Sequence, residues 1–150
     1  MKNSIFSIIL VSIFSLLEMS CSSQKELKIT GDETPIVSFA KERCRGFCPA
    51  YTLEIFESNK LRYTGQANVK IMGEQIFNLK KEEVINLKKA FEASEFEKFE
   101  REYLSGYMDI PKFTLIYKGQ RIDYHEKSAT EEIKELSALV DRYFPKEKKD

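Results

Sequence analysis

The sequence predicts an α+β fold, an antiparallel sheet of about five to six strands with two main helices covering one face. Three observations support this prediction. Segments in which apolar and polar residues alternate, as in half-buried strands, come in two pairs, and a short polar turn joins each pair. Two longer segments repeat their apolar residues at helical spacing. Each predicted hairpin is followed by one of these helices.

The first part of the predicted domain is β-structure. Residues 35–42 (PIVSFAKE) predict a first strand, and residues 51–57 (YTLEIFE) alternate apolar and polar side chains. The chain returns through residues 61–65 across a polar turn, which completes a hairpin. Residues 68–79 read as one longer or bent strand, with Gly73 at a turn or bulge.

A first helix is predicted after this strand, with Asn78 as its cap and Glu82 and Glu83 in its first turn. Its buried stripe consists of Val84, Leu87 and Phe91. Residues 103–111 are predicted to form a loop.

The second hairpin comprises residues 113–117 and 120–125, around Lys118-Gly119. Ser128 is predicted to open the final helix, with Glu131 three residues on as its capping-box partner. The apolar stripe of this helix consists of Ile133, Leu136, Val140 and Tyr143.

The two hairpins share a pattern. Residues 52–63 and 114–124 both read Thr-Leu, Ile, an aromatic residue, a basic residue, Leu or Ile, and a closing Tyr, once a gap is placed at Glu54. This pattern fits a hairpin-plus-helix pseudo-repeat, and it fits two unrelated amphipathic hairpins equally well.

The N-terminus is predicted to be an export signal. The apolar run of residues 5–17 follows Lys2, and its length is typical of a signal peptide and too short for a transmembrane helix. It ends in LEMSC, which resembles the lipobox of bacterial lipoproteins; Ser20 and Cys21 match, whereas Glu18 departs from the usual aliphatic residue. Cleavage by an ordinary signal peptidase is the alternative.

These features predict four regions. Residues 1–20 are a signal peptide, residues 21–34 a lipidated Cys21 (diacylglyceryl thioether and N-acyl chain) with its tether, residues 35–145 a single domain, and residues 146–150 a charged tail. Because Ser22 is not an acidic inner-membrane retention signal, the expected location is the bacterial cell envelope, anchored in the outer membrane on its periplasmic or its surface face.

Charge and motifs exclude several functions. Lys+Arg and Asp+Glu both total 24, so the formal net charge is zero, which argues against a nucleic-acid binder. The sequence contains no P-loop, GxGxxG, GxSxG, HExxH or EF-hand pattern. We therefore predict no catalytic residue and no cofactor, and the sequence leans away from an enzyme.

Cys44 and Cys48 lie four residues apart in a chain with an export signal. A structural disulfide is the leading interpretation, because exported cysteines are usually bridged and Gly46 lets so short a loop close. A redox-active pair is the second, since neighbouring arginines would lower a thiolate pKa. A copper or zinc site that adds His125, the one histidine of the chain, is the third.

The segment CRGFCPAY, residues 44–51, resembles an uncharacterised family of bacterial secreted or lipid-anchored proteins whose hallmark is CxGxCPxY. Cys44, Gly46, Cys48, Pro49 and Tyr51 match it. The weaker later matches are Gly65, Asp109, Pro111 and His125. The resemblance covers roughly residues 35–145 and implies an envelope domain of unknown function, with no activity, substrate or cofactor attached.

Two functional hypotheses follow. The first is a non-catalytic, lipid-anchored module that binds an envelope protein, a peptide or a glycan, with Tyr103, Tyr107 and Asp109 as a candidate binding loop. The alternative is a thiol-redox or copper/zinc-binding protein that uses Cys44, Cys48 and His125.

Overall fold

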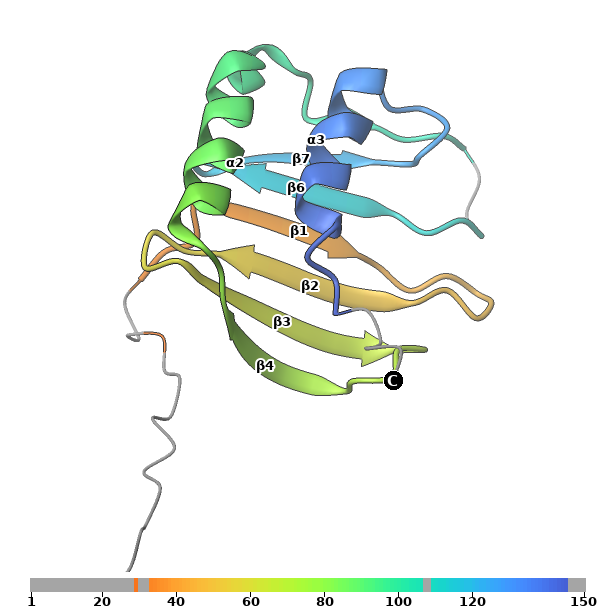
Figure 1. Ribbon diagram of the computed structural model, residues 1–150. Helices are drawn as coiled ribbons and strands as arrows, with labels where there is room; N and C mark the ends of the chain where they lie inside the picture. Colours follow the sequence, from red (N-terminus) through yellow and green to blue (C-terminus); the bar gives the residue numbers. More distant parts are fainter. Residues whose placement is uncertain (1–28, 30–32, 107–108, 146–150) are drawn as a thin grey trace, which may run out of the picture.

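The computed structural model in Figure 1 describes residues 29, 33–106 and 109–145. The predicted signal peptide, Cys21, Tyr107 and the charged tail lie outside these residues. No helix in the described part of the chain is long and apolar enough to cross a membrane.

The fold is α+β, with two α-helices and one mostly antiparallel sheet of seven strands in the order β4-β3-β2-β1-β6-β7-β5. The elements are β1 (Val37–Lys41), β2 (Ala50–Ile55), β3 (Lys60–Ala67), β4 (Gly73–Asn78), α2 (Lys81–Ala93), the 3-10 turn η2 (Phe96–Lys98), β5 (Glu102–Tyr103), β6 (Phe113–Tyr117), β7 (Gln120–Tyr124) and α3 (Glu131–Asp141).

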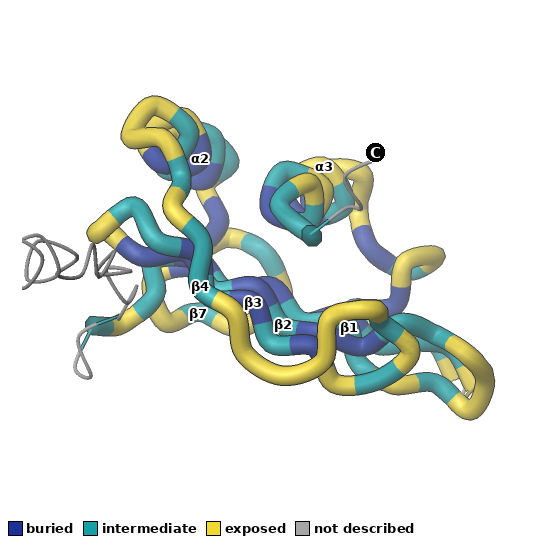
Figure 2. Tube along the Cα trace, turned by 60° about the horizontal axis from the view of Figure 1, so that its bottom comes forward, coloured by how far each residue is buried: buried dark blue, intermediate teal, exposed yellow. Residues whose placement is uncertain are grey.

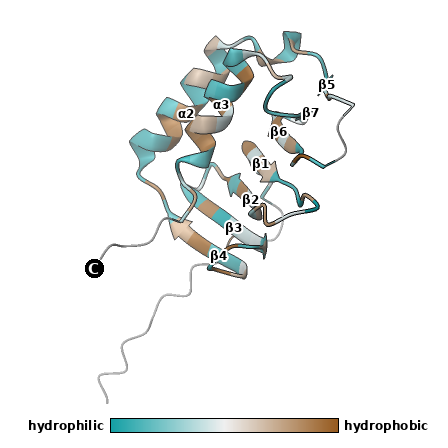
Figure 3. Ribbon diagram, turned by 90° about the vertical axis from the view of Figure 1, so that its right-hand side faces the viewer, coloured by the Kyte–Doolittle hydropathy of each residue, from teal (hydrophilic) through white to brown (hydrophobic). Residues whose placement is uncertain are grey.

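Both helices lie on the same face of the sheet, as Figure 2 shows. The strands turn alternate residues toward the helices, and Figure 3 shows the resulting alternation of apolar and polar residues along them. The side chains that meet between the layers are almost fully buried, among them Phe39, Leu53, Tyr63, Phe91, Leu115, Ile122 and Ile133. Burial of these side chains supplies most of the driving force for folding.

The strand count is higher than predicted because the sheet contains one additional short strand, β5. Residues 102–103 form the short strand β5, which pairs in parallel with β7, so Tyr103 lies in a strand and not in the predicted loop of residues 103–111. The predicted long strand over residues 68–79 was also wrong, because only its second half is extended. Asn68 has a left-handed backbone with a φ of 51°, and residues 68–72 form a loop instead.

Both predicted helix caps were wrong. Asn78 is the last residue of β4, and α2 begins after Lys80, whose backbone N–H donates to the Glu83 carboxylate at 2.8 Å. Helix α3 is capped by Thr130, whose hydroxyl accepts from the Ile133 N–H at 3.3 Å. Ser128 instead donates its N–H to the His125 carbonyl in the turn before the helix.

The two predicted hairpins lie on either side of the central strand β1. Phe39 of β1 pairs with Leu53 on one side and with Leu115 on the other, so the Thr-Leu pairs occupy matching positions. Val37 pairs with Ile55 and with Tyr117, so Ile55 does not match Ile116 as the proposed gap at Glu54 requires. The closing tyrosines do not match. Tyr63 pairs with Leu53, whereas Tyr124 pairs with Phe113, which is two residues away from the equivalent position.

Three loops lie at one end of the sheet, which we call the loop end. They are residues 42–49 after β1, residues 68–72 after β3, and residues 104–106 with residues 109–112 before β6. Because β1 is antiparallel to β2 and β6, the described chain enters the sheet at Ile36, at the opposite end.

Candidate functional site

The loop between β1 and β2 carries the predicted disulfide. Cys44 and Cys48 are bridged, with 2.03 Å between their sulfur atoms and 5.7 Å between their Cα atoms. The Gly46 N–H donates to the Cys44 sulfur at 3.2 Å across the small ring. The bridge leaves neither cysteine as the thiolate that metal binding needs.

Three long-range contacts hold this loop in place. The Arg43 guanidinium donates to the Gln66 carbonyl at 3.1 Å, and the Asn68 side-chain amide donates to the Cys48 carbonyl at 3.1 Å. Arg45 forms an ion pair with Asp109 at 3.0 Å. The disulfide loop therefore contacts the end of β3 and both of the other loops of the loop end.

The tip of the disulfide loop is Phe47, whose side chain is 95% exposed. Five large apolar residues are exposed in the described part of the chain, and four of them lie in the loops of the loop end: Phe47, Ile71, Met72 and Leu104. Ile85 on α2 is the fifth. Single exposed apolar residues are ordinary on protein surfaces, but their concentration at one end is typical of an interaction surface.

A groove of about 550 Å³ opens beside the disulfide loop. Its apolar walls come from four segments distant in sequence, and its lining residues are Pro49, Tyr51, Tyr63, Asn68, Val69, Lys70, Ile71, Phe144 and Pro145. A volume of this size lies within the range of small-ligand sites. Pro49 and Tyr51 belong to the CRGFCPAY segment, so the segment contributes to the groove as well as to the disulfide.

Tyr51 joins the sheet to α3 at the base of this groove. Its hydroxyl donates to the Asp141 carboxylate, and its ring packs against Phe144 with 4.4 Å between ring centroids. Burial, followed by the hydrogen bond and the negative charge of Asp141, raises the pKa of Tyr51 far above its ordinary value. Tyr51 therefore stays protonated and serves as a structural donor, not as a base or a nucleophile.

Gly65 allows the loop of residues 68–72 to fold back over β3. A Cβ atom at this position would lie 2.0 Å from the Ile71 carbonyl oxygen and 2.6 Å from the Tyr63 hydroxyl. These two groups form a hydrogen bond of 2.8 Å directly above the glycine. The wall of the groove thus requires a residue without a side chain on the strand beneath it.

The predicted site residues His125 and Tyr103 do not line the groove. His125 is buried, and its Nδ1 accepts the Ser105 N–H at 2.9 Å, as in a histidine that stabilises the fold. Within the described residues, no group of three or more His, Cys, Asp and Glu side chains is arranged to hold a metal ion. The structure therefore does not assemble the three-ligand site.

Tyr103, a residue of the candidate binding loop, is half-buried in β5, and its hydroxyl accepts the Glu100 N–H at 3.1 Å.

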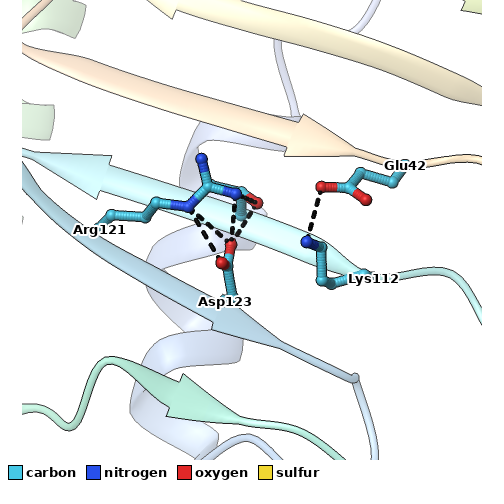
Figure 4. A network of polar contacts seen from close by, with 5 residues as sticks. Glu42, Lys112, Arg121 and Asp123 are labelled. Atoms are coloured by element: carbon cyan, nitrogen blue, oxygen red, sulfur yellow. Dashed lines mark hydrogen bonds and ion pairs between the residues drawn. The ribbon is translucent and has the colours of Figure 1, made fainter. Parts of the chain in front are cut away.

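The opposite face of the sheet carries a polar network that the sequence analysis did not single out. Figure 4 shows Arg121 beside Asp123, and Lys112 beside Glu42. Arg121 and Asp123 lie 2.9 Å apart, Lys112 and Glu42 3.1 Å apart, and the Thr114 hydroxyl donates to Asp123 at 2.6 Å. Burial alone would raise the pKa of Asp123, but the hydrogen bonds from Arg121 and Thr114 hold it below its ordinary value. Arg121 and Asp123 are two residues apart in one strand and therefore lie on the same face of the sheet. This spacing is the sequence signal that would have indicated the network.

Comparison with known families supplies the classification. Residues 35–144 match the family model described as a domain of unknown function, DUF6438. The chain belongs to the DUF6438 family. No curated protein matches it. The affiliation with lipid-anchored proteins and the CxGxCPxY hallmark remain predictions, and membership of DUF6438 supplies no activity, substrate or partner.

Proposed function

We propose that this DUF6438 protein is an exported, lipid-anchored binding module of the bacterial cell envelope that has no catalytic activity. The proposed binding surface is the loop end, and the proposed partner is another envelope protein. The disulfide serves to hold the binding loop in one conformation, because a rigid loop loses less conformational entropy when it binds.

One observation carries this proposal: four of the five exposed large apolar residues in the described chain lie in the three loops of the loop end. Exposure of this kind contributes nothing to the hydrophobic core. An aromatic side chain on a rigid loop is instead a typical anchor of a protein–protein interface. Phe47, almost fully exposed on the disulfide loop, is the anchor that we expect to contribute most.

The position of the loop end also suits an anchored protein. The described chain reaches β1 at the other end of the sheet, so a tether over residues 21–34 would join the domain on the side away from Phe47. A random coil of fourteen residues spans about 20 Å on average. The loop end would then face away from the membrane surface, where another envelope protein can reach it.

Site-specific photo-cross-linking in intact cells tests this proposal. A photoreactive phenylalanine analogue at position 47 is expected to form adducts with one defined partner, whereas the same analogue at the position of Ile85 is expected to form none. The partner so identified is then measured against purified Phe47→Ser and Ile85→Ser variants. We expect at least a tenfold loss of affinity for the first and less than a twofold loss for the second.

Two results would overturn the proposal. Equal adduct patterns at positions 47 and 85 would mean that the loop end has no special role. Rapid reduction of the Cys44–Cys48 bridge by a thiol, together with turnover of a disulfide substrate, would favour the thiol-redox alternative, for which the flanking Arg43 and Arg45 would stabilise a thiolate. Mass spectrometry of the native protein tests the predicted acylation of Cys21.

A further inference from the structure

Strand β4 forms one edge of the sheet, and Figure 1 shows it as the outermost strand next to β3. It is six residues long and pairs with β3 along its whole length without a register shift. The opposite edge is formed by β5, which has only two residues. The two edges therefore differ greatly in how much unpaired backbone they offer.

The hydrogen bonds at the ends of the hairpins show which residues of β4 point outward. Phe56 donates its N–H to Lys60, and Leu79 donates its N–H to Asn59. Hydrogen-bonded residue pairs alternate along an antiparallel ladder. Both bonds therefore mean that the backbone N–H and C=O groups of residues 73, 75 and 77 of β4 point toward β3. The N–H and C=O groups of Glu74, Ile76 and Asn78 consequently point away from the sheet.

This edge lacks most of the features that normally prevent strands from pairing. Natural edge strands are protected by proline, by bulges, by lysine or by very short length. The sequence of β4 is GEQIFN, which contains one charged residue and no proline or lysine. The first three residues are exposed, and Ile76 and Phe77 are half-buried.

We infer that two copies of this chain pair through β4, antiparallel, about a twofold axis that passes through Ile76. In this register Ile76 lies opposite Ile76 of the second copy, and Glu74 lies opposite Asn78. All three outward residues of each strand are then paired, and each of the three cross-strand residue pairs exchanges two backbone hydrogen bonds. The two seven-stranded sheets become continuous.

The side chains select this register over its neighbours. Residues directly opposite each other in a sheet have Cβ atoms about 4.5–5.5 Å apart, so the two Ile76 side chains touch and the Asn78 amide can donate to the Glu74 carboxylate. A slip of two residues puts Glu74 opposite Ile76 and leaves Asn78 beyond the end of the other strand. A slip of four residues puts two Glu74 carboxylates opposite one another, which is destabilising.

Cysteine cross-linking of the full chain in intact cells tests both the dimer and its register. Ile76→Cys is expected to form a covalent dimer on mild oxidation, because hydrogen-bonded strand pairs have Cα atoms about 5.5 Å apart, which is within disulfide range. Glu74→Cys alone is the matched control and is expected to form no covalent dimer, since its partner position is 78. Glu74→Cys co-expressed with Asn78→Cys is expected to restore the cross-link between the two kinds of chain.

A second measurement does not depend on cysteine chemistry. Native mass spectrometry of the purified full chain is expected to show a dimer, and Ile76→Lys is expected to lower the dimer fraction at least tenfold while its circular dichroism stays unchanged. The inference would be overturned if Ile76→Cys formed no covalent dimer, if Glu74→Cys alone cross-linked to the same extent, or if Ile76→Cys cross-linked to a different protein. None of these outcomes depends on binding at Phe47, so the proposed function stands or fails separately.

Discussion

Replacing Gly65 with alanine gives a sharp test of how the groove is built. The added Cβ would lie 2.0 Å from the Ile71 oxygen, 2.6 Å from the Tyr63 hydroxyl and 2.9 Å from a Val69 methyl group. A carbonyl oxygen and a fully buried ring cannot both move aside without changing the loop. We therefore expect residues 68–72 to lift off β3.

The magnitude follows from two costs. Inserting a methyl group into a packed site typically costs 1–3 kcal/mol. Lifting the loop also breaks the hydrogen bond from Tyr63 to Ile71, and because the freed hydroxyl then meets water, this loss costs about 0.5–1.5 kcal/mol more. The free energy of unfolding of Gly65→Ala should thus fall by about 1.5–4.5 kcal/mol, which is a large part of the stability of a domain of this size.

Urea unfolding followed by circular dichroism measures this loss, and Gly106→Ala is the matched control. A Cβ at Gly106 would meet no atom within 4 Å, so this variant should stay within about 0.5 kcal/mol of the parent. A loss below about 1 kcal/mol for Gly65→Ala would refute the reasoning, because it would mean that the loop yields without cost. Equal losses in both variants would refute it as well.

Three further predictions concern the contacts around the site. Tyr51→Phe leaves the Asp141 carboxylate without its donor and should cost about 1–3 kcal/mol in urea unfolding, while Tyr51→Phe combined with Asp141→Asn should cost less than the sum of the two single variants. Replacing Cys44 and Cys48 with serine should cost about 2 kcal/mol, because the closed loop is short; a loss below 0.5 kcal/mol would contradict this. The depressed pKa of Asp123 adds stability above about pH 4, and this stability is lost as the pH falls through the folded-state value. Thermal melts at successive pH values should therefore show a smaller acid loss in Asp123→Asn than in the parent, and parallel curves would be the contrary result.

Much of the fold could be predicted from local sequence. Alternation identified the first strand and both hairpins, and helical spacing gave the buried positions Val84, Leu87 and Phe91 of α2. These signals are local, because burial of one face imposes a period on the residues of a single element. The second apolar stripe succeeded for the same reason at Ile133, Leu136 and Val140, whereas its fourth predicted residue, Tyr143, lies beyond the end of α3 and is only half-buried.

The errors share a different cause. The loop of residues 68–72 has strand-like residues, but it folds back because Tyr63 donates to Ile71 and Asn68 donates to Cys48. Strand β5 exists only because β7 lies beside it. Neither element can be read from its own segment, since the deciding partners are distant in sequence.

The candidate site shows the same division. The Cys44–Cys48 pair was apparent from spacing and an export signal, but the contacts that hold the loop in place were not. Arg45 and Asp109 are 64 residues apart, and nothing in either segment indicates the other. The His125 metal hypothesis likewise depended on proximity, and the structure gives that histidine a backbone donor instead.

Phe47 and Gly65 together indicate how structure and function are divided at the loop end. Gly65 is required by the fold, because no other residue fits beneath the Ile71 carbonyl. Phe47 is not required by the fold, since its ring is 95% exposed and a serine there would remove no buried contact. A substitution at position 65 should therefore lower both stability and binding, whereas one at position 47 should lower binding alone. That separation is what distinguishes a binding surface from a structural loop, and a Phe47→Ser variant with lower stability but normal partner affinity would assign the loop to folding.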